Sequence, residues 1–250
     1  MKKYIALMLA LCMVFAFAAC GAKTEAPKAE DPSAKSEGVM TYADYAAAAM
    51  DTEVVVETYV QAKQGWWDNK ATLYTQDGDG AYFVYDAACS EEDYAKLTDG
   101  AKIKVTGYKG EWAGEVEIMD ATIEILEGSW VAPVLDVTDK LGTDELINFQ
   151  NQKVAFKGMT VEAANDDGAA FLYNWDGSGA EGTDSDLYFN ASVNGQTYTF
   201  VIEYYLTGAD SDAYKAVQAL KVGDKIDMEG FLYWYNGAQP HITSVTVAAE

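Results

Sequence analysis

The sequence has no arginine, one histidine, three cysteines and four prolines among its 250 residues. Lysine therefore supplies all 17 basic side chains, against 40 acidic ones, and the formal net charge is −23. Nucleic-acid binding depends on clustered cations that neutralise phosphates, and base reading uses the bidentate fork of arginine. We therefore expect nucleic acid to be disfavoured as a partner, and we expect the acidity to give solubility and attraction for cations.

The scarcity of histidine and cysteine excludes most catalytic sites. His241 is the only histidine, so neither a multi-histidine zinc site nor a histidine pair acting as general acid and base is available. Cys89 is the only cysteine outside the N-terminal 20 residues, which excludes an internal disulfide in the folded part. We interpret Cys89 as a buried, inert thiol. The glycine-rich segment 177–182 lacks the Lys-Ser/Thr ending of a phosphate loop. The sequence predicts no catalytic residue, and we expect the protein not to be an enzyme.

The N-terminus has the pattern of an export signal. Lys2 and Lys3 precede an apolar run, 5–19, that is shorter than the roughly 20 residues needed to span a bilayer. Residues 17–20, Phe-Ala-Ala-Cys, resemble the lipobox of bacterial lipoproteins, although that motif usually has an aliphatic residue in place of Phe17. The resemblance implies a signal peptide over 1–19 and a lipid such as palmitate on Cys20. It also implies a cell-membrane protein facing the extracellular side. The alternative is an ordinary signal peptide with an incidental Cys20.

The chain after Cys20 divides by composition. Residues 20–38 are rich in Ala, Lys, Glu, Ser and Pro and contain no aromatic residue, which predicts a disordered tether. The segment around Trp130 and Pro133 separates the remainder into two predicted domains, 39–130 and 131–250. Each has a normal size for one hydrophobic core.

An internal repeat supports this division. Segment 97–108 aligns with 220–231 without a gap, and the identical positions are Leu97 and Leu220, Gly100 and Gly223, Lys102 and Lys225, Ile103 and Ile226, and Gly107 and Gly230. The register continues to Gly114 and Gly237. We infer two copies of one domain.

Each copy has the same predicted order of elements. In the first copy, alternating polarity and turn signals predict strands over 53–63, 71–74, 82–85, 102–108 and 115–126, with a short helix from Ser90 to near Leu97. In the second copy the strands are 153–161, 170–175, a third in two pieces (187–190 and 198–205), 225–235 and 242–247, with a helix over 212–220. Helices over 41–50 and 143–149 are expected to cap the barrels. This is the order of a five-stranded Greek-key barrel, the OB-fold. The predicted fold class is all-β with short helices, in two tandem OB-fold-like barrels.

The repeated segments resemble the OB-fold modules of secreted Gram-positive proteins, which occur in lipoproteins and beside extracellular nucleases. The residues that carry the resemblance are 97–108 with the following 111–115, and 223–237. The resemblance implies a barrel with a binding face and assigns no catalytic residue.

Aromatic residues on the predicted strands and turns are the candidate ligand-binding set, because aromatic platforms stack on sugars, bases or peptide side chains. They are Trp66, Trp67, Tyr74, Tyr82 and Trp112 in the first copy, and Tyr173, Trp175, Tyr233, Trp234 and Tyr235 in the second. The alternative is that most of them pack in the barrel cores. Because Trp66 and Trp67 are adjacent, we expect one of them to be exposed.

Acidic turns leave calcium open as a cofactor. The candidate ligands are Asp77, Asp79, Asp176, Asp184 and Asp186, although neither loop completes an EF-hand pattern and solvated turns are the alternative. The sequence thus predicts a membrane-anchored, non-catalytic binding module for a glycan, peptide or cation. Its alternative is a nucleic-acid-binding accessory protein, and the oligomeric state is left open.

Overall fold

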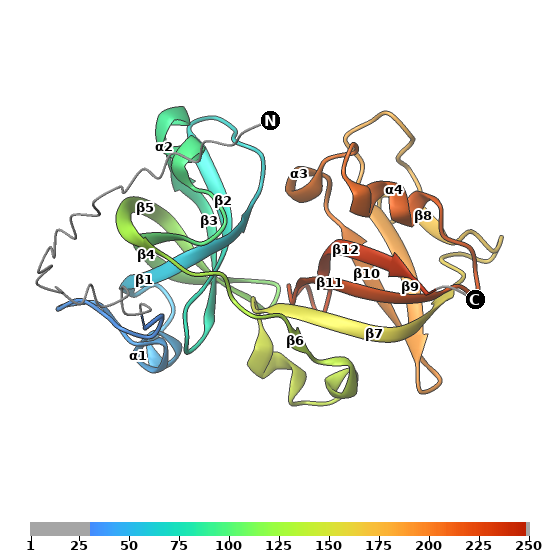
Figure 1. Ribbon diagram of the computed structural model, residues 1–250, viewed down its shortest axis with the longest axis horizontal. Helices are drawn as coiled ribbons and strands as arrows, with labels where there is room; N and C mark the ends of the chain where they lie inside the picture. The colour runs from blue at the N-terminus through green and yellow to red at the C-terminus, as the bar shows by residue number, and fades with distance from the viewer. Residues whose placement is uncertain (1–30, 249–250) are drawn as a thin grey trace, which may run out of the picture.

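The computed structural model describes residues 31–248, and the predicted signal peptide and Cys20 lie outside the described residues. The described chain forms two barrels side by side, the first drawn in blue to green and the second in yellow to red (Figure 1).

The first barrel has five strands, β1 (Glu53–Lys63), β2 (Lys70–Gln76), β3 (Ala81–Ala88), β4 (Ala101–Trp112) and β5 (Glu115–Ser129). They close in the order β1-β2-β3-β5-β4. The β3–β5 pair is parallel and the other pairs are antiparallel. The short helix α2 (Glu91–Lys96) connects β3 to β4 and begins at the N-cap Ser90, whose side chain accepts a hydrogen bond from Asp93 N. The predicted OB-fold order is confirmed.

The second barrel repeats this order with β7 (Lys153–Glu162), β9 (Leu187–Val193), β10 (Gln196–Ile202), β11 (Lys225–Phe231) and β12 (His241–Val247). The sheet closes because β7 pairs with β9 as well as with β11, and β10 pairs with β12 in parallel. Two short strands, β6 (Leu135–Asp136) and β8 (Phe171–Tyr173), extend the sheet beside β7 and β9. The predicted fold class, two tandem OB-fold-like barrels, is confirmed.

The second and third strands of this barrel differ from the prediction. Segment 170–175 was expected to be the second strand, but it contributes only β8, which pairs with residues 187–189 of β9 on the edge where residues 190–192 pair with β7. The second strand is β9, because that stretch reaches both β7 and β10. Local alternation of apolar residues identified both segments as strands, whereas strand pairing decides which one belongs to the barrel.

The short helices pack on the barrels. Helix α1 (Tyr42–Ala47) has a capping box from Thr41 and buries Tyr45, whose ring lies 4.9 Å from that of Tyr82. Helix α4 (Asp212–Gln218) buries Ala213, Tyr214 and Val217 in the second core, and α3 (Tyr204–Thr207) follows β10. The helix predicted over 143–149 is only a 3₁₀ turn, η2 (Leu146–Phe149), after η1 (Thr138–Lys140). Within residues 31–248, no helix is long and apolar enough to cross a membrane.

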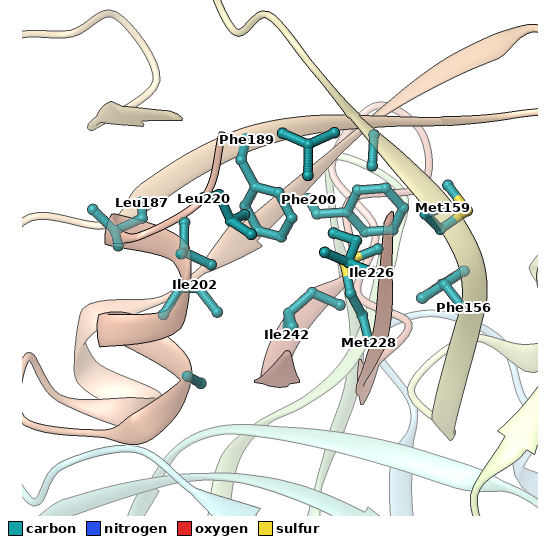
Figure 2. Close-up of a cluster of buried hydrophobic side chains, with 14 of the residues drawn as sticks. Phe156, Met159, Leu187, Phe189, Phe200, Ile202, Leu220, Ile226, Met228 and Ile242 are labelled. Carbon is teal, nitrogen blue, oxygen red and sulfur yellow. The ribbon is translucent and has the colours of Figure 1, made fainter. Parts of the chain in front are cut away.

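Each barrel has its own core, and a third cluster joins them. Figure 2 shows the second core, where Phe156, Phe189 and Phe200 lie together with aliphatic side chains from the surrounding strands. The buried residues of the first core lie between Tyr45 and Ala121, and the partly buried hydrophobic residues packed against them lie within 40–125. The third cluster contains Tyr74 and Phe83 of the first barrel and Phe231 of the second, and the Tyr74 and Phe231 rings stack at 4.4 Å. The barrels are therefore packed against each other through buried aromatic side chains.

Candidate functional site

OB-folds bind ligands on the face of strands two and three, between the connections that join strands one to two and four to five. In the second barrel these connections are 163–186 and 232–240, and in the first they are 64–69 and 113–114. Two adjoining cavities of about 620 and 580 Å³ lie where these regions of the two barrels meet. Both cavities are lined by Trp112, Glu203, Tyr233 and His241. We call the two together the inter-barrel cleft.

His241 lies at the centre of the cleft, at the start of β12. Its Nδ1 atom lies 2.6 Å from the Tyr74 hydroxyl and 3.3 Å from a Glu203 carboxylate oxygen, and the Tyr233 ring stacks on it at 4.3 Å. Complete burial raises the pKa of Tyr74 well above its ordinary value, so the phenol keeps its proton and remains hydrogen-bonded to Nδ1 of His241. His241 is thereby fixed between the two barrels.

Three carboxyl groups line the cleft. Glu203 accepts hydrogen bonds from Gln64 Nε2 at 2.7 and 2.9 Å, a contact between the barrels. Asp186 accepts one from Tyr204 N at 2.8 Å, and burial raises its pKa. Burial, with a contribution from Asp86, raises the pKa of Glu117 to about 7. None of the residues that line the two cavities is a lysine, and the one lining side chain able to carry a positive charge, His241, lies 3.3 Å from the Glu203 carboxylate.

Large aromatic side chains form the remaining walls. Trp112 comes from the end of β4 and is 63% exposed, Trp175 from the 163–186 connection is 74% exposed, and Tyr235 from the 232–240 connection is 47% exposed. Aromatic rings this exposed have free faces on which a ligand ring or cation can stack. The cleft therefore combines stacking surfaces with hydrogen-bond acceptors.

The structure brings together four of the ten aromatic candidates at the cleft, Trp112, Trp175, Tyr233 and Tyr235. Tyr74 and Tyr82 are fully buried, so they serve packing. Tyr173 and Trp234 pack against the second core. These placements follow from strand register, which the sequence pattern does not show.

Trp66 and Trp67 lie at a separate cavity. Trp66 donates from Nε1 to the carbonyl of Cys89 and is half-buried, whereas Trp67 is 78% exposed. They line a pocket of about 350 Å³ with Lys70 and Tyr205. The pair thus divides into one covered and one exposed ring, as expected for neighbouring residues that face opposite ways.

Several cleft residues were not among the predicted site residues: Gln64, Tyr85, Glu117, Glu203 and His241. Tyr85 lies on the third strand of its barrel, so the OB-fold assignment was the signal that pointed to it. No sequence feature distinguished Glu203 as a site residue, because it is one of 40 acidic residues. Only the fold places it beside the first barrel.

The predicted calcium ligands are dispersed. Asp77 is buried and accepts hydrogen bonds from Lys35, Tyr82 and the backbone of its own turn. Asp176 accepts one from Ser178 N, and Asp186 belongs to the cleft. Within residues 31–248, no group of three or more His, Cys, Asp or Glu side chains is arranged to hold a metal ion.

No family model and no curated protein matches the chain. Among solved structures, it is similar to the tetrameric p202 HIN2, with 10% identity over 80% of this chain and 96% of that chain and a TM-score of 0.33. It is also similar to the Ifi202 HINa domain in complex with 20-bp double-stranded DNA, with 13% identity, the same coverages and a TM-score of 0.33. A third is p202 HIN1 in complex with 12-mer double-stranded DNA, with 13% identity, coverages of 80% and 94% and a TM-score of 0.32.

The expectation that nucleic acid is disfavoured as a partner is not borne out among these similar chains. Two of the three chains named above were solved in complex with double-stranded DNA. Net charge and amino-acid composition describe the whole chain, whereas binding depends on the local electrostatic potential at one face of the molecule. Composition therefore does not decide this partner class.

Proposed function

We propose that this chain is a non-catalytic binding protein, lipid-anchored through Cys20 on the outer side of the membrane, whose ligand occupies the inter-barrel cleft. The observation that carries the proposal is the convergence of OB-fold binding regions from both barrels on one cleft with exposed Trp112, Trp175 and Tyr235. The size of the larger cavity, about 620 Å³, is normal for a small-molecule site.

The composition of the cleft supports binding over catalysis. Its only histidine, His241, is hydrogen-bonded to Tyr74 through Nδ1 and stacks on the ring of Tyr233. One face of the imidazole and its Nδ1 atom are therefore already occupied by other side chains. Cys89 is buried away from the cleft lining, and burial raises the pKa of its thiol, which disfavours the reactive thiolate. The tethered barrels would present the cleft to ligands outside the cell.

The test is an array of glycans, peptides and small organic molecules against the chain from Asp31 onward, read by tryptophan fluorescence. Trp112→Ala and Trp175→Ala should each weaken binding at least about tenfold, because a stacking contact is lost. Trp67→Ala is the matched control, since Trp67 is equally exposed but lies outside the cleft. Equal affinities for all three variants would reject the cleft as the binding site.

Nucleic acid is the second candidate ligand, at a different place. The 64–69 connection of the first barrel carries Trp66 and Trp67 beside Lys70, whose Nζ lies 3.0 Å from Asp86 in the same pocket. A stacking ring next to a lysine suits bases and phosphates, and a phosphate would have to displace Asp86 from Lys70. The resemblance of the sequence to OB-fold modules beside secreted nucleases agrees with this reading.

Fluorescence anisotropy with single- and double-stranded DNA tests this second candidate. Binding that falls with rising salt and is weakened by Trp67→Ala and Lys70→Ala, but not by Trp175→Ala, would support it. Binding that depends on Trp175 would instead assign nucleic acid to the inter-barrel cleft.

A further inference from the structure

The charge of the inter-barrel cleft defines a ligand class more narrowly than its shape does. Glu203 and Asp186 face the larger cavity, and Glu117 faces the adjoining one. The side chain of Glu203 is only 15% exposed, accepts hydrogen bonds from the neutral Gln64 amide and lies 3.3 Å from Nδ1 of His241. Asp186 likewise accepts from a neutral donor, the Tyr204 backbone amide. These amide donors orient the two side chains and supply no counter-charge of their own.

Low-dielectric walls concentrate the field of these carboxylates. Tyr233 stacks on His241, and Phe83 packs edge-on against Tyr233 with a ring separation of 5.4 Å. Charges set among such apolar rings are screened less by water than charges on an open surface. Burial raises the pKa of Asp186 and Glu117, and a positively charged ligand in the cleft would oppose this shift by stabilising their ionised forms.

The exposed aromatic rings favour the same charge. Trp112, Trp175 and Tyr235 present free faces at the larger cavity. The face of an aromatic ring carries partial negative charge and attracts a cation, most strongly for tryptophan. Ammonium ions with methyl or methylene substituents combine this attraction with burial of apolar surface.

We propose that the inter-barrel cleft binds an organic ammonium ion, with the aromatic rings of Trp112 and Trp175 around the cationic group and the carboxylates of Glu203 and Asp186 beside it. The inference rests on the proposed function, because it assigns a ligand class to the same cleft.

The experiment is isothermal titration calorimetry with two cations, choline and spermidine, and with 3,3-dimethyl-1-butanol, the neutral isostere of choline. At least one cation should bind, and choline should bind about tenfold or more tightly than its isostere, because only the charge differs. Absence of binding by both cations at millimolar concentrations would overturn the proposal. Equal binding of choline and its isostere would overturn it as well.

Substitution of single carboxylates tests whether the preference for a cation arises in the inter-barrel cleft. Glu203→Gln and Asp186→Asn should each weaken cation binding about tenfold, because each removes one facing charge while keeping the side-chain shape. Glu124→Gln is the matched control, since Glu124 is 62% exposed on β5, pairs with Lys104 and lines neither cavity. Circular dichroism verifies that each variant folds, and Asp186→Asn keeps the test decisive if Glu203→Gln loosens the contact with Gln64.

The two proposals fail in different ways. If a neutral glycan or peptide binds and Trp112→Ala weakens that binding, the cleft is a binding site and only the ammonium assignment is rejected. If choline binds with equal affinity to the parent and to the Trp112, Trp175 and Glu203 variants, the cleft is not its site and the ammonium assignment is rejected. The proposed function is rejected as well if every ligand from the array also binds the Trp112 and Trp175 variants as tightly as the parent.

Discussion

The Nζ atom of Lys35 lies 2.6 Å from Oδ2 of Asp77 and ties the segment before the first barrel to the β2–β3 turn. The two side chains are 9% and 0% exposed, and the same carboxylate oxygen accepts a hydrogen bond from Tyr82 at 2.7 Å. Lys35 also donates to the carbonyl of Glu57. Residues 31–38, which composition places in a disordered tether, thus include a side chain that completes the first barrel.

Lys35→Ala should destabilise the first barrel by on the order of 3 kcal/mol, because it leaves the Asp77 carboxylate buried without its counter-charge. A chain that begins at residue 39 should lose as much stability as the variant. Urea unfolding of the two chains and of the chain from Asp31 measures this. Lys225→Ala, which removes an exposed lysine of the second barrel, is the control. Unchanged stability in Lys35→Ala would show that the ion pair contributes nothing.

Gly107 and Gly230, which the repeat aligns, should not tolerate a side chain. A Cβ atom on Gly107 would lie 2.7 Å from the Met119 carbonyl oxygen, and one on Gly230 would overlap the His241 backbone. Alanine at either position should therefore cost several kcal/mol, because backbone atoms of the neighbouring strand would have to move. Gly65→Ala, whose Cβ would meet only an ordinary contact at 3.8 Å, is the control for thermal unfolding. Similar melting temperatures for all three variants would contradict the prediction.

Glu115 should make stability depend on pH. It is fully buried at the junction and accepts hydrogen bonds from Trp234 N and Gln150, and burial raises its pKa to about 8 from the ordinary 4.5. Because the folded-state pKa is raised, the folded protein favours the protonated form. This contribution to stability is fully present below pH 4.5 and is lost as the pH rises through 8.

Glu115→Gln should therefore be more stable than the parent at pH 9, by on the order of 2–4 kcal/mol, since each pKa unit corresponds to about 1.4 kcal/mol. The substitution should also reduce the change in the free energy of unfolding between pH 4.5 and pH 8. The pH dependence that remains includes the contribution of Glu117, which extends up to about pH 7. Denaturant midpoints across this pH range measure both effects. A variant that is less stable than the parent at pH 9 would show that ionised Glu115 is well accommodated.

Phe231 should couple the barrels. Phe231→Ala removes the ring that stacks on Tyr74 and should cost about 3–5 kcal/mol. In calorimetry, the two barrels of this variant should unfold in two separate transitions. Phe156→Ala, in the core of the second barrel, should destabilise that barrel without uncoupling it from the first.

The separated halves provide an independent test of the domain boundary. Pieces 31–130 and 131–250 should each fold, because each keeps a complete core of its own. Each should be less stable than in the parent, since Tyr74 and Phe83 or Phe231 become exposed. If circular dichroism finds both pieces unfolded, the barrels are one cooperative unit and the predicted boundary is wrong.

Cys20→Ser should abolish lipidation and release the protein from the membrane fraction, because the lipobox resemblance provides its only predicted anchor. Fractionation of cells with metabolic labelling by a palmitate analogue measures both effects. Cys12→Ser is the control, because Cys12 lies inside the predicted signal peptide. A Cys20→Ser protein that remains in the membrane fraction would show that another element anchors it.

The sequence determined the local structure well, because strand alternation, helix caps and turn glycines act over a few residues. The aligned Gly107 and Gly230 marked the same position in both barrels, and Ser90 marked the start of α2 correctly. The second strand of the second barrel was misassigned, since 170–175 and 187–193 have similar patterns and only pairing with β7 distinguishes them.

The inter-barrel cleft was decided by tertiary structure alone. Trp112 and Trp175 were recognisable as aromatic candidates, but nothing in the sequence separated them from Tyr74 and Tyr82, whose rings are fully buried. Glu203 becomes a cleft residue only because β10 ends beside Gln64 of the other barrel. A sequence pattern specifies which side of a strand is apolar, whereas the packing of one barrel on another brings together residues more than a hundred positions apart. The elements of this protein were therefore set by local chemistry, and its candidate site by long-range packing.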